Sequence, residues 1–312
     1  MLSDHLEGFT EHLRILHGLK DKSIRAYSKH VEEFIVWAGD PAPGDVNQAM
    51  VEGFLKHLFI GRGNSNQTRR TKLLAVDKFW RFLKYSKVVP ENITEEIPRP
   101  KVKNKMMQDF SRNEVVYMFK VPDIYSEKGL RDICILICLA FAGCRVSEVV
   151  GLRLSDLRDD GQYIDMMLSD DIVKQDRSRI VDLWKAPSIF IRQWLSVRIG
   201  HGAGSSSPLF VSYRRGGRMT GNPLTSKDID RLLKRIAEDA GLRKTSCHAH
   251  MFRATHGADL RHIEGMDIAA IAQRLGHKSI ATTDKYIPKR GRITKTYRSL
   301  RDYWREFETL WG

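Results

Sequence analysis

The sequence predicts a mainly α-helical protein of two domains, with a small antiparallel β-sheet in the second domain. Apolar residues recur at helical spacing through most of the 312 residues. One stretch, 163–183, alternates as β-strands do, and a segment with two prolines, 91–108, divides the chain into two parts of ordinary domain size. We therefore expect a helical domain over 1–92, a linker over 93–108 and an α+β domain over 109–312.

The first domain is predicted to contain helices that are separated by polar turns. They are expected over 6–16, 23 to about 38, 47–59 and 66–86. Ser23 is the candidate N-cap of the second helix, and Gly61 opens a cluster of helix-breaking residues after the third. The fourth helix has one broad apolar face, so its basic side chains are expected to point outward.

The second domain is predicted to alternate helices with a short sheet. Its helices are expected to begin near Ser111 and Arg145 and to cover 131–142, 222–240 and 267–275. The sequence Ser-Arg-Asn-Glu from Ser111 fits a capping box, and Gly241 and Gly276 fit helix ends. Three short strands are expected within 163–183.

The charge of the chain points to a polyanionic partner. The net charge is +14 and the pI about 9.7. Residues 56–87 carry nine basic side chains and one acidic one, and residues 285–301 carry seven basic side chains and no acidic one. Such runs can also be ordinary solvated faces. The candidate DNA-binding residues are Arg62, Arg69, Arg70, Lys72, Lys78 and Arg81.

Membrane insertion, secretion and metal binding are not expected. The sequence has neither an apolar run of 18 residues nor a basic leader followed by an apolar segment, which predicts a cytoplasmic protein. The four cysteines contain no Cys-x-x-Cys pair, so reduced structural thiols are expected. The irregular spacing of one Cys/His cluster disfavours a zinc site there; it comprises Cys247, His248, His250, His256 and His262.

The C-terminal part of the sequence holds the residue types of a phosphodiester site. Tyr286 follows His277 by nine residues, and a phenol with its usual pKa near 10 needs a neighbouring base or cation to act as a nucleophile. Arg145 and Arg253 supply guanidinium groups, which bind phosphate oxygens bidentately. The sequence shows no nucleotide-binding glycine loop and no carboxylate cluster for two metals, so no cofactor is expected.

These residues follow one another in the order of a known family. The motifs are Arg-x-x-Glu at 145–148, a lysine at 174, His-x-x-Arg at 250–253, Leu-Gly-His at 275–277 and a tyrosine at 286. Because the motifs occur in this order, the chain resembles the Xer-like tyrosine recombinases of the phage-integrase type. The resemblance extends over nearly the whole chain. The resemblance implies a DNA core-binding domain followed by a catalytic domain, and the catalytic residues Arg145, Lys174, His250, Arg253, His277 and Tyr286.

The resemblance also implies a role for each of these residues. The two arginines would hold the non-bridging oxygens of the scissile phosphate, and Tyr286 would attack with help from His250. Lys174 would protonate the leaving 5′ oxygen, and His277 would donate a hydrogen bond to the phosphate. The flanks of Lys174 lack the glycine that the family often has there, so Lys185 and Arg177 are alternatives. Ala254 stands where the family often has a second histidine, which we interpret as a change of packing.

The expected partner is double-stranded DNA, bound by a homo-tetramer that exchanges strands through a Holliday junction. A second recombinase or an accessory protein is a further possible partner. An aromatic stripe in the last 20 residues indicates a terminal helix, which would pack on a neighbouring protomer or on its own domain. The alternatives are a type IB topoisomerase-like or hairpin-forming enzyme, and a DNA-binding protein that keeps the scaffold without turnover.

Overall fold

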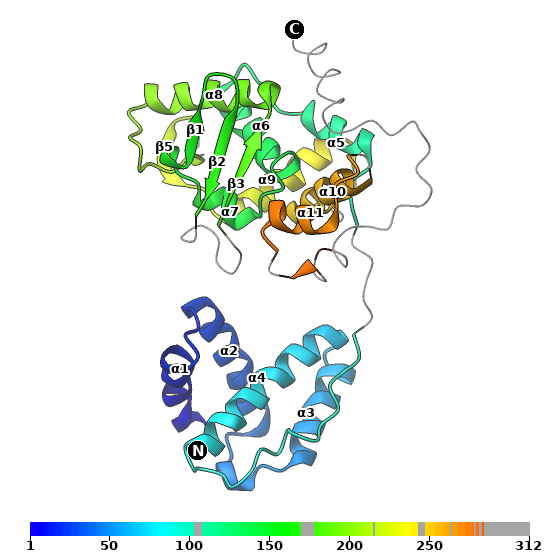
Figure 1. Cartoon of the computed structure of the whole chain (residues 1–312). Helices are drawn as coiled ribbons and strands as arrows, with labels where there is room; N and C mark the ends of the chain where they lie inside the picture. Colours follow the sequence, from blue (N-terminus) through cyan, green and yellow to red (C-terminus); the bar gives the residue numbers. More distant parts are fainter. Residues whose placement is uncertain are drawn as a thin grey trace. The chain divides into compact units, whose positions relative to one another are not determined.

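The computed structural model divides the chain into two compact units, Met1–Lys105 and Met106–Gly312 (Figure 1). The structure describes residues 1–102, 108–169, 178–214, 216–242, 247–262, 264–277, 279–280 and 283. Among these residues helices dominate and the sheets are small and antiparallel, which confirms the predicted fold class. Within the described ranges, no helix combines the length and apolar character needed to cross a bilayer.

The N-terminal unit consists of four α-helices, preceded and interrupted by short 3-10 turns. The helices are α1 (Leu6–Ile15), α2 (Asp21–Ala38), α3 (Gln48–Ile60) and α4 (Asn66–Tyr85). Asn47 and Ser65 cap α3 and α4 by accepting a hydrogen bond from a backbone N–H in the first turn. The second helix was expected to have Ser23 as its N-cap, but it begins two residues earlier, at Asp21. Its N-cap is Lys20, whose side chain makes no capping hydrogen bond.

Aromatic rings fill the core of the N-terminal unit. Phe34 of α2 meets Phe54 of α3 and Trp80 of α4 edge to face, with ring centroids 5.3 and 5.7 Å apart. Phe9 of α1 packs on Phe79 of α4 in the same way at 5.2 Å. Because α4 contributes to each of these groups, it is the central helix of the unit, and its opposite side remains available for polar residues.

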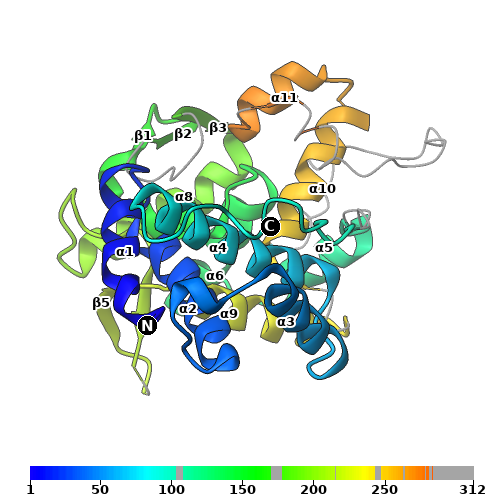
Figure 2. The same ribbon diagram turned by 90° about the horizontal axis from the view of Figure 1, so that it is seen from below.

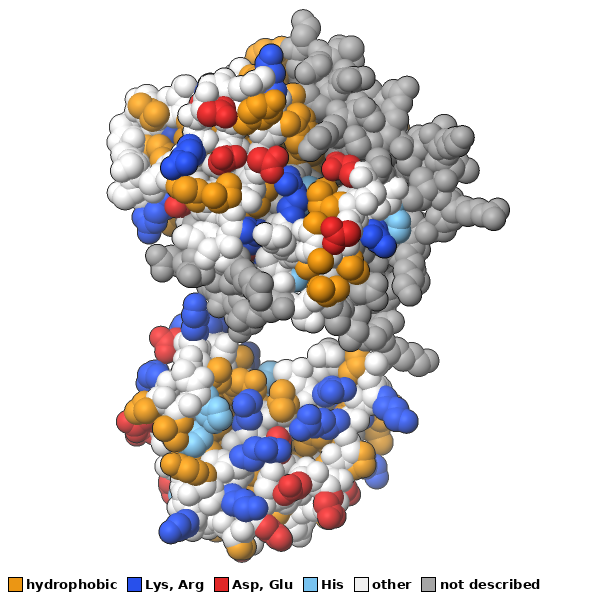
Figure 3. Space-filling view, in the orientation of Figure 1, with side chains coloured by type: hydrophobic (Ala, Val, Ile, Leu, Met, Phe, Trp, Pro, Cys, Tyr) orange, Lys and Arg blue, Asp and Glu red, His pale blue; other side chains and the backbone are white. Residues whose placement is uncertain are grey.

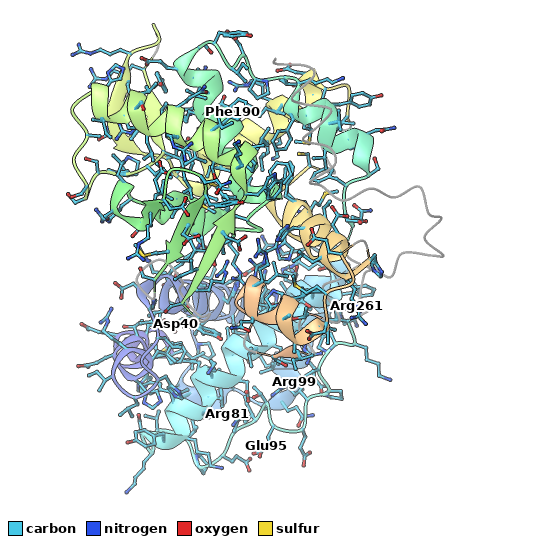
Figure 4. All side chains as sticks on the ribbon, turned by 45° about the horizontal axis from the view of Figure 1, so that its top comes forward. Asp40, Arg81, Glu95, Arg99, Phe190 and Arg261 are labelled. Carbon is cyan, nitrogen blue, oxygen red and sulfur yellow. The ribbon has the colours of Figure 1, made fainter. Side chains whose placement is uncertain are left out.

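The segment after α4 returns along the same unit. Asp77 of α4 is buried and accepts hydrogen bonds from Asn92 and Thr94, both at 2.9 Å. Arg81 binds its other oxygen, and Arg99 comes within 4.0 Å of it. Figure 4 labels both arginines on the N-terminal unit. Ile97 is part of the unit's core. The first part of the segment expected as a linker therefore packs on the N-terminal unit, and the linker bounds 93–108 stay a prediction.

The described part of the C-terminal unit combines seven helices with two small sheets. Its helices are α5 (Arg112–Phe119), α6 (Glu127–Ala140), α7 (Val146–Gly151), α8 (Lys185–Gly200), α9 (Ser226–Asp239), α10 (Ala249–His262) and α11 (Ile268–Leu275). Its strands are β1 (Leu157–Asp159), β2 (Ile164–Leu168), β3 (Arg179–Leu183), β4 (Val211–Tyr213) and β5 (Met219–Pro223). The strand order β1-β2-β3 and the β4-β5 hairpin are both antiparallel.

Helix α6 is the centre of the C-terminal unit, because each of its residues from Gly129 to Ala140 is buried. It packs against α8 and α10, and α8 also contacts β2. Helices α10 and α11 lie side by side at one edge of the unit (Figure 2). The helix that leads into the Arg145 segment is thus enclosed on several sides, which fixes the position of that segment.

Several predicted elements agree with the structure and others do not. The capping box of Ser111 and Glu114 is present, and Asp267 and Gly276 bound α11 as expected. The expected helix 222–240 begins only at Ser226, because Thr225 and Asp228 form its capping box and the preceding residues form β5. Strands β1, β4 and β5 and helix α8 were not anticipated. The second of the three strands expected within 163–183, at 171–174, lies outside the described residues.

Candidate active site

Arg145 is the N-cap of α7, directly after the buried helix α6. Its backbone N–H donates to Oε2 of Glu148 at 2.8 Å, and its Nη1 donates to Oε1 of the same carboxylate at 3.1 Å. The side chain of Arg145 is 29% exposed. The carboxylate of Glu148 therefore fixes both the backbone and the guanidinium of Arg145, while part of the side chain stays accessible to a ligand.

Gly143 forms the turn before Arg145 in a conformation that other residues rarely adopt. Its φ is +61°, and a Cβ at this position would lie 2.6 Å from Cδ2 of His256 and 3.0 Å from Cδ2 of Leu275. A real side chain does not fit there without displacing α10 or α11. The absence of a side chain at Gly143 thus lets three segments of the site meet.

Arg253 lies on α10 and is almost completely buried, with 1% of its surface exposed. Its Nη1 donates to the carbonyl oxygen of Gly143 at 2.6 Å, and its Nη2 donates to the carbonyl oxygen of Leu275. A guanidinium has five N–H donors in one rigid plane. Two carbonyls from two different segments therefore set the orientation of that plane.

His250 lies one turn before Arg253 on α10 and keeps an exposed edge. Partial burial lowers its pKa to about 4, and the positive charges of Arg253 and Arg145 act in the same direction. The imidazole is accordingly neutral near pH 7. A neutral imidazole can accept a proton, and a bound phosphate would raise its pKa again by adding a negative charge.

His277 follows the left-handed end of α11 at Gly276. It is buried, and its Nδ1 lies 2.8 Å from Oγ1 of Thr283. Burial lowers its pKa to about 3, with Arg253 and Arg145 contributing further. The structure thus brings together four of the six catalytic residues expected from the sequence: Arg145, His250, Arg253 and His277.

Strand β3 joins the site through two ion pairs that the sequence did not indicate. Arg179, its first residue, donates to Glu148 through Nη1 at 3.1 Å and Nη2 at 2.8 Å. Asp182 of the same strand accepts from Nη1 of Arg274 on α11 at 2.7 Å. The strand is therefore anchored both to the carboxylate that holds Arg145 and to the helix that precedes His277.

Lys174 and Tyr286 lie outside the described residues, as do the alternative Arg177 and the terminal aromatic stripe. The other alternative, Lys185, begins α8. In the part of the chain that the structure describes, no three His, Cys, Asp or Glu side chains converge as metal ligands would. The four cysteines are buried with free thiols, and burial raises the pKa of Cys144 to about 12.

The basic residues of α4 differ in their surroundings. Figure 3 shows Lys and Arg side chains gathered on the face of the N-terminal unit that carries α4. Arg70 is exposed, whereas the guanidinium of Arg69 lies 4.5 Å above the ring of Phe59. The ammonium of Lys78 lies 5.4 Å from the ring of Tyr27. Each of these three cations lies at or near the surface.

Lys72 differs from the expectation that the basic residues of α4 point outward. It is buried, and its Nζ donates to Oε1 of Glu33 on α2 at 2.6 Å. Arg62 pairs with the same carboxylate from the exposed side. The ion pair with Glu33 ties α4 to α2, so in this structure the charge of Lys72 stabilises helix packing rather than a surface patch.

Arg179 and Gly143 are the residues that sequence reasoning missed. Arg179 occupies an inward position of a strand whose burial alternates, together with Val181 and Leu183. A charged residue at a core-facing position requires a buried partner, and this signal was available in the sequence. Gly143 directly precedes Cys144 and Arg145, but neither its positive φ nor its contacts can be read from a single sequence.

Models of two protein families match the chain. The Phage integrase family model matches residues 108–291, and the model of the phage integrase N-terminal SAM-like domain matches residues 6–88. Similar sequences include tyrosine recombinase XerC of Pelobacter propionicus, 29% identical over 91% of this chain and 90% of that protein. XerC of Xylella fastidiosa strain M23 is 27% identical over 91% of this chain and 92% of that protein.

Solved structures share the fold at lower sequence identity. A crystal structure of XerH site-specific recombinase bound to a palindromic difH substrate has a TM-score of 0.71 at 19% identity, over 91% of this chain and 80% of that one. A lambda integrase dimer bound to a COC′ core site has a TM-score of 0.70 at 16% identity, over 95% and 98%. The family resemblance inferred from the motifs is confirmed. Because the first family model covers more than half of the 312 residues, the chain belongs to the phage integrase family of tyrosine recombinases.

Proposed function

We propose that this site-specific recombinase cuts and rejoins duplex DNA through the cluster of Arg145, His250, Arg253 and His277, with Tyr286 as the nucleophile. The observation that carries the proposal is the convergence of these four side chains from three separate segments, around a region where burial and, after it, the positive charges of Arg253 and Arg145 lower the pKa of both histidines. Such a region attracts an anion, and a DNA phosphate is the anion that the +14 charge of the chain favours.

The two arginines are proposed to bind the non-bridging oxygens of the scissile phosphate. Both are held before DNA arrives, Arg145 by a carboxylate and Arg253 by two carbonyls. Donors that are already oriented stabilise a transition state without reorganisation. Loss of either one should raise the barrier by about 3–4 kcal/mol, or slow cleavage about 100- to 1,000-fold. Arg253→Lys should also be severe, because one ammonium cannot reproduce the planar fork.

In the proposed step, the Oη of Tyr286 attacks the phosphorus and a 3′-phosphotyrosyl ester forms. His250 accepts the phenolic proton, which its neutral state allows. The bond from phosphorus to the 5′ oxygen breaks, and Lys174 supplies the proton that the leaving oxygen needs. His277 donates a hydrogen bond to the phosphate. Attack by a 5′ hydroxyl from another strand reverses the step and conserves the energy of the ester, so no cofactor is needed.

Double-stranded DNA is also proposed to contact the basic face of α4. The exposed cation Arg70 and the ring-supported cations Arg69 and Lys78 are placed for phosphate contacts. Arg62 and Arg81 are exposed as well, each paired with a carboxylate of its own unit. These contacts provide a salt-dependent part of the affinity, and base contacts by either unit would add sequence selectivity.

Strand exchange requires several protomers on one DNA complex. We propose a homo-tetramer with a Holliday junction intermediate, assembled in the cytoplasm, where a second recombinase or an accessory protein could join it. The C-terminal aromatic stripe is proposed to pack on a neighbouring protomer, since head-to-tail donation of a terminal segment closes a ring. Truncation of residues 294–312 would then reduce strand exchange more than binding to a single site, and an equal loss of both would indicate packing within one protomer.

The test of the proposed function is a suicide-substrate assay. The wild type and Tyr286→Phe are incubated in EDTA with nicked duplexes from the neighbourhood of the gene, and denaturing gels reveal covalent adducts. An adduct with the wild type that is lost in the variant supports the proposal. Sequence-selective binding by the wild type without an adduct on any duplex would favour a DNA-binding protein without turnover.

A further inference from the structure

We infer that Arg179 is a positioning residue for phosphate binding: through Glu148 it fixes the guanidinium of Arg145 and leaves its positive charge available to DNA. The inference rests on the proposed function and adds to it a residue outside the family motifs that the chain carries. It follows from the geometry of one carboxylate that two arginines share.

Glu148 is saturated by these two arginines. Its Oε1 accepts from Nη1 of Arg145 and from Nη1 of Arg179, both at 3.1 Å. Its Oε2 accepts from the backbone N–H of Arg145 and from Nη2 of Arg179, both at 2.8 Å. A carboxylate has about four acceptor positions, so these four bonds hold it in one orientation. Arg179 provides half of them.

The two arginines differ in their access to a ligand. The side chain of Arg179 is 5% exposed and that of Glu148 is 1% exposed, whereas the side chain of Arg145 is 29% exposed. Arg179 donates from both of its Nη groups to the buried carboxylate of Glu148, whereas Arg145 has the larger exposed part that a phosphate can reach. We therefore infer that Arg179 acts on the reaction through Glu148.

The charges of the group explain why a second arginine is useful. A buried carboxylate paired with Arg145 alone would form a neutral pair, and it would compete with a phosphate for the guanidinium. With Arg179 present, the group of two arginines and one carboxylate keeps a net charge of about +1. Burial alone would raise the pKa of Glu148, but the bonds and charge of Arg179, together with the charge of Arg253 and the backbone N–H of Arg145, outweigh it and the pKa is lowered. Arg179 thus neutralises the negative charge of Glu148 from the buried side of the group.

The experiment compares single-turnover cleavage by the full-length wild type, Arg179→Gln and a matched control, Arg192→Gln. The control removes another two-bond arginine–carboxylate pair of the same unit, in which Arg192 of α8 binds Asp159 at 2.7 Å through Nε and Nη2. Two suicide substrates are used, one with a normal scissile phosphate and one with a methylphosphonate. The methylphosphonate lacks the negative charge that Arg145 is proposed to hold.

Arg179→Gln is expected to slow cleavage of the normal substrate about 10- to 100-fold, because a displaced catalytic group can cost about that much. On the methylphosphonate its rate should be close to that of the wild type, and Arg192→Gln should behave as the wild type on both. Arg179→Lys, which keeps the charge on Glu148 but loses the fork, should fall in between. Thermal unfolding and DNA affinity are measured for each variant, so that rates are compared only for folded, bound protein.

An equal loss on the two substrates would overturn the inference, because a role in folding alone does not depend on the charge of the phosphate. Unchanged cleavage of the normal substrate by Arg179→Gln would overturn it as well. A wild type that forms no adduct on either substrate would instead contradict the proposed function itself, and the inference would fail with it. The three outcomes are distinguishable on one gel series.

Discussion

Replacing Gly143 with alanine perturbs the site at the point where its segments meet. The residue has a φ of +61°, and the added Cβ would approach His256 to 2.6 Å and Leu275 to 3.0 Å. Its carbonyl oxygen also accepts a hydrogen bond from Nη1 of Arg253 at 2.6 Å. A shift of this turn therefore moves Arg253 and the beginning of α7 together.

The cost of Gly143→Ala has two parts. An alanine in the left-handed region costs about 1–2 kcal/mol, and one extra methyl group in a packed core costs about 1–3 kcal/mol. Together they predict a loss of about 2–5 kcal/mol in the free energy of unfolding, from a total of about 5–15 kcal/mol. For a unit of this size the midpoint of thermal unfolding should fall by roughly 4–20 °C.

The assay is thermal unfolding combined with cleavage of a suicide substrate below the midpoint. Gly202→Ala is the matched control, because Gly202 has a φ of +78° and a Cβ added there would meet no atom within 4 Å. It should lose only the backbone part of the stability and keep its cleavage activity. If Gly143→Ala loses no more stability than Gly202→Ala and cleaves DNA at the same rate, the described contact of the three segments is wrong.

Two further predictions concern pH and charge. The pKa values of His250 and His277 are about 4 and about 3 in the folded protein, below the usual 6.5, so the unfolded chain takes up protons first as the pH falls. The contribution of these two neutral histidines to the stability of the DNA-free protein should therefore be fully present above pH 6.5 and be lost as the pH falls toward 3, and His277→Gln should reduce this dependence in a series of unfolding midpoints. Lys72→Met should lower stability, since the buried Lys72 pairs with the partly buried Glu33, and should leave the salt dependence of DNA binding unchanged. Arg70→Ala should leave the stability unchanged and should reduce by about one the slope of log binding constant against log salt concentration. A reduced slope for Lys72→Met and an unchanged slope for Arg70→Ala in binding titrations would contradict the assignment of Lys72 to helix packing and of Arg70 to DNA binding.

The sequence was most predictive where a local signal decides the structure. Ser111 and Glu114 form a capping box, and Gly276 ends α11 in a left-handed conformation. Prediction failed where local signals are weak. Lys20 makes no side-chain capping bond, so the beginning of α2 has no marker. Strand β5 contains Gly221, Asn222 and Pro223, which disfavour strands, and its pairing with β4 is a tertiary contact that no local signal predicts.

The sequence could predict those site residues that belong to short sequence motifs. Arg145, His250, Arg253 and His277 were expected at the site from the order of the motifs, and the structure brings them together, while their catalytic roles stay a prediction. The role of Arg179 depends on a carboxylate 31 positions away, and such a pairing depends on how β3 lies against α7. Lys72 shows the same limit, since a helical pattern gives the side of α4 on which it lies but not the acid that it meets.

The central claim is that the clustered residues bind one phosphate for attack by Tyr286. The most direct measurement isolates the covalent adduct formed on a suicide substrate, digests it and maps the attached nucleotide by mass spectrometry, with Arg145→Ala and Arg253→Ala in parallel. We predict a single adduct at Tyr286, joined to the 3′ end of the cleaved strand, and loss of the adduct in both variants while DNA binding persists. An adduct at another residue or through a 5′ end, or normal adduct formation without either arginine, would contradict the claim.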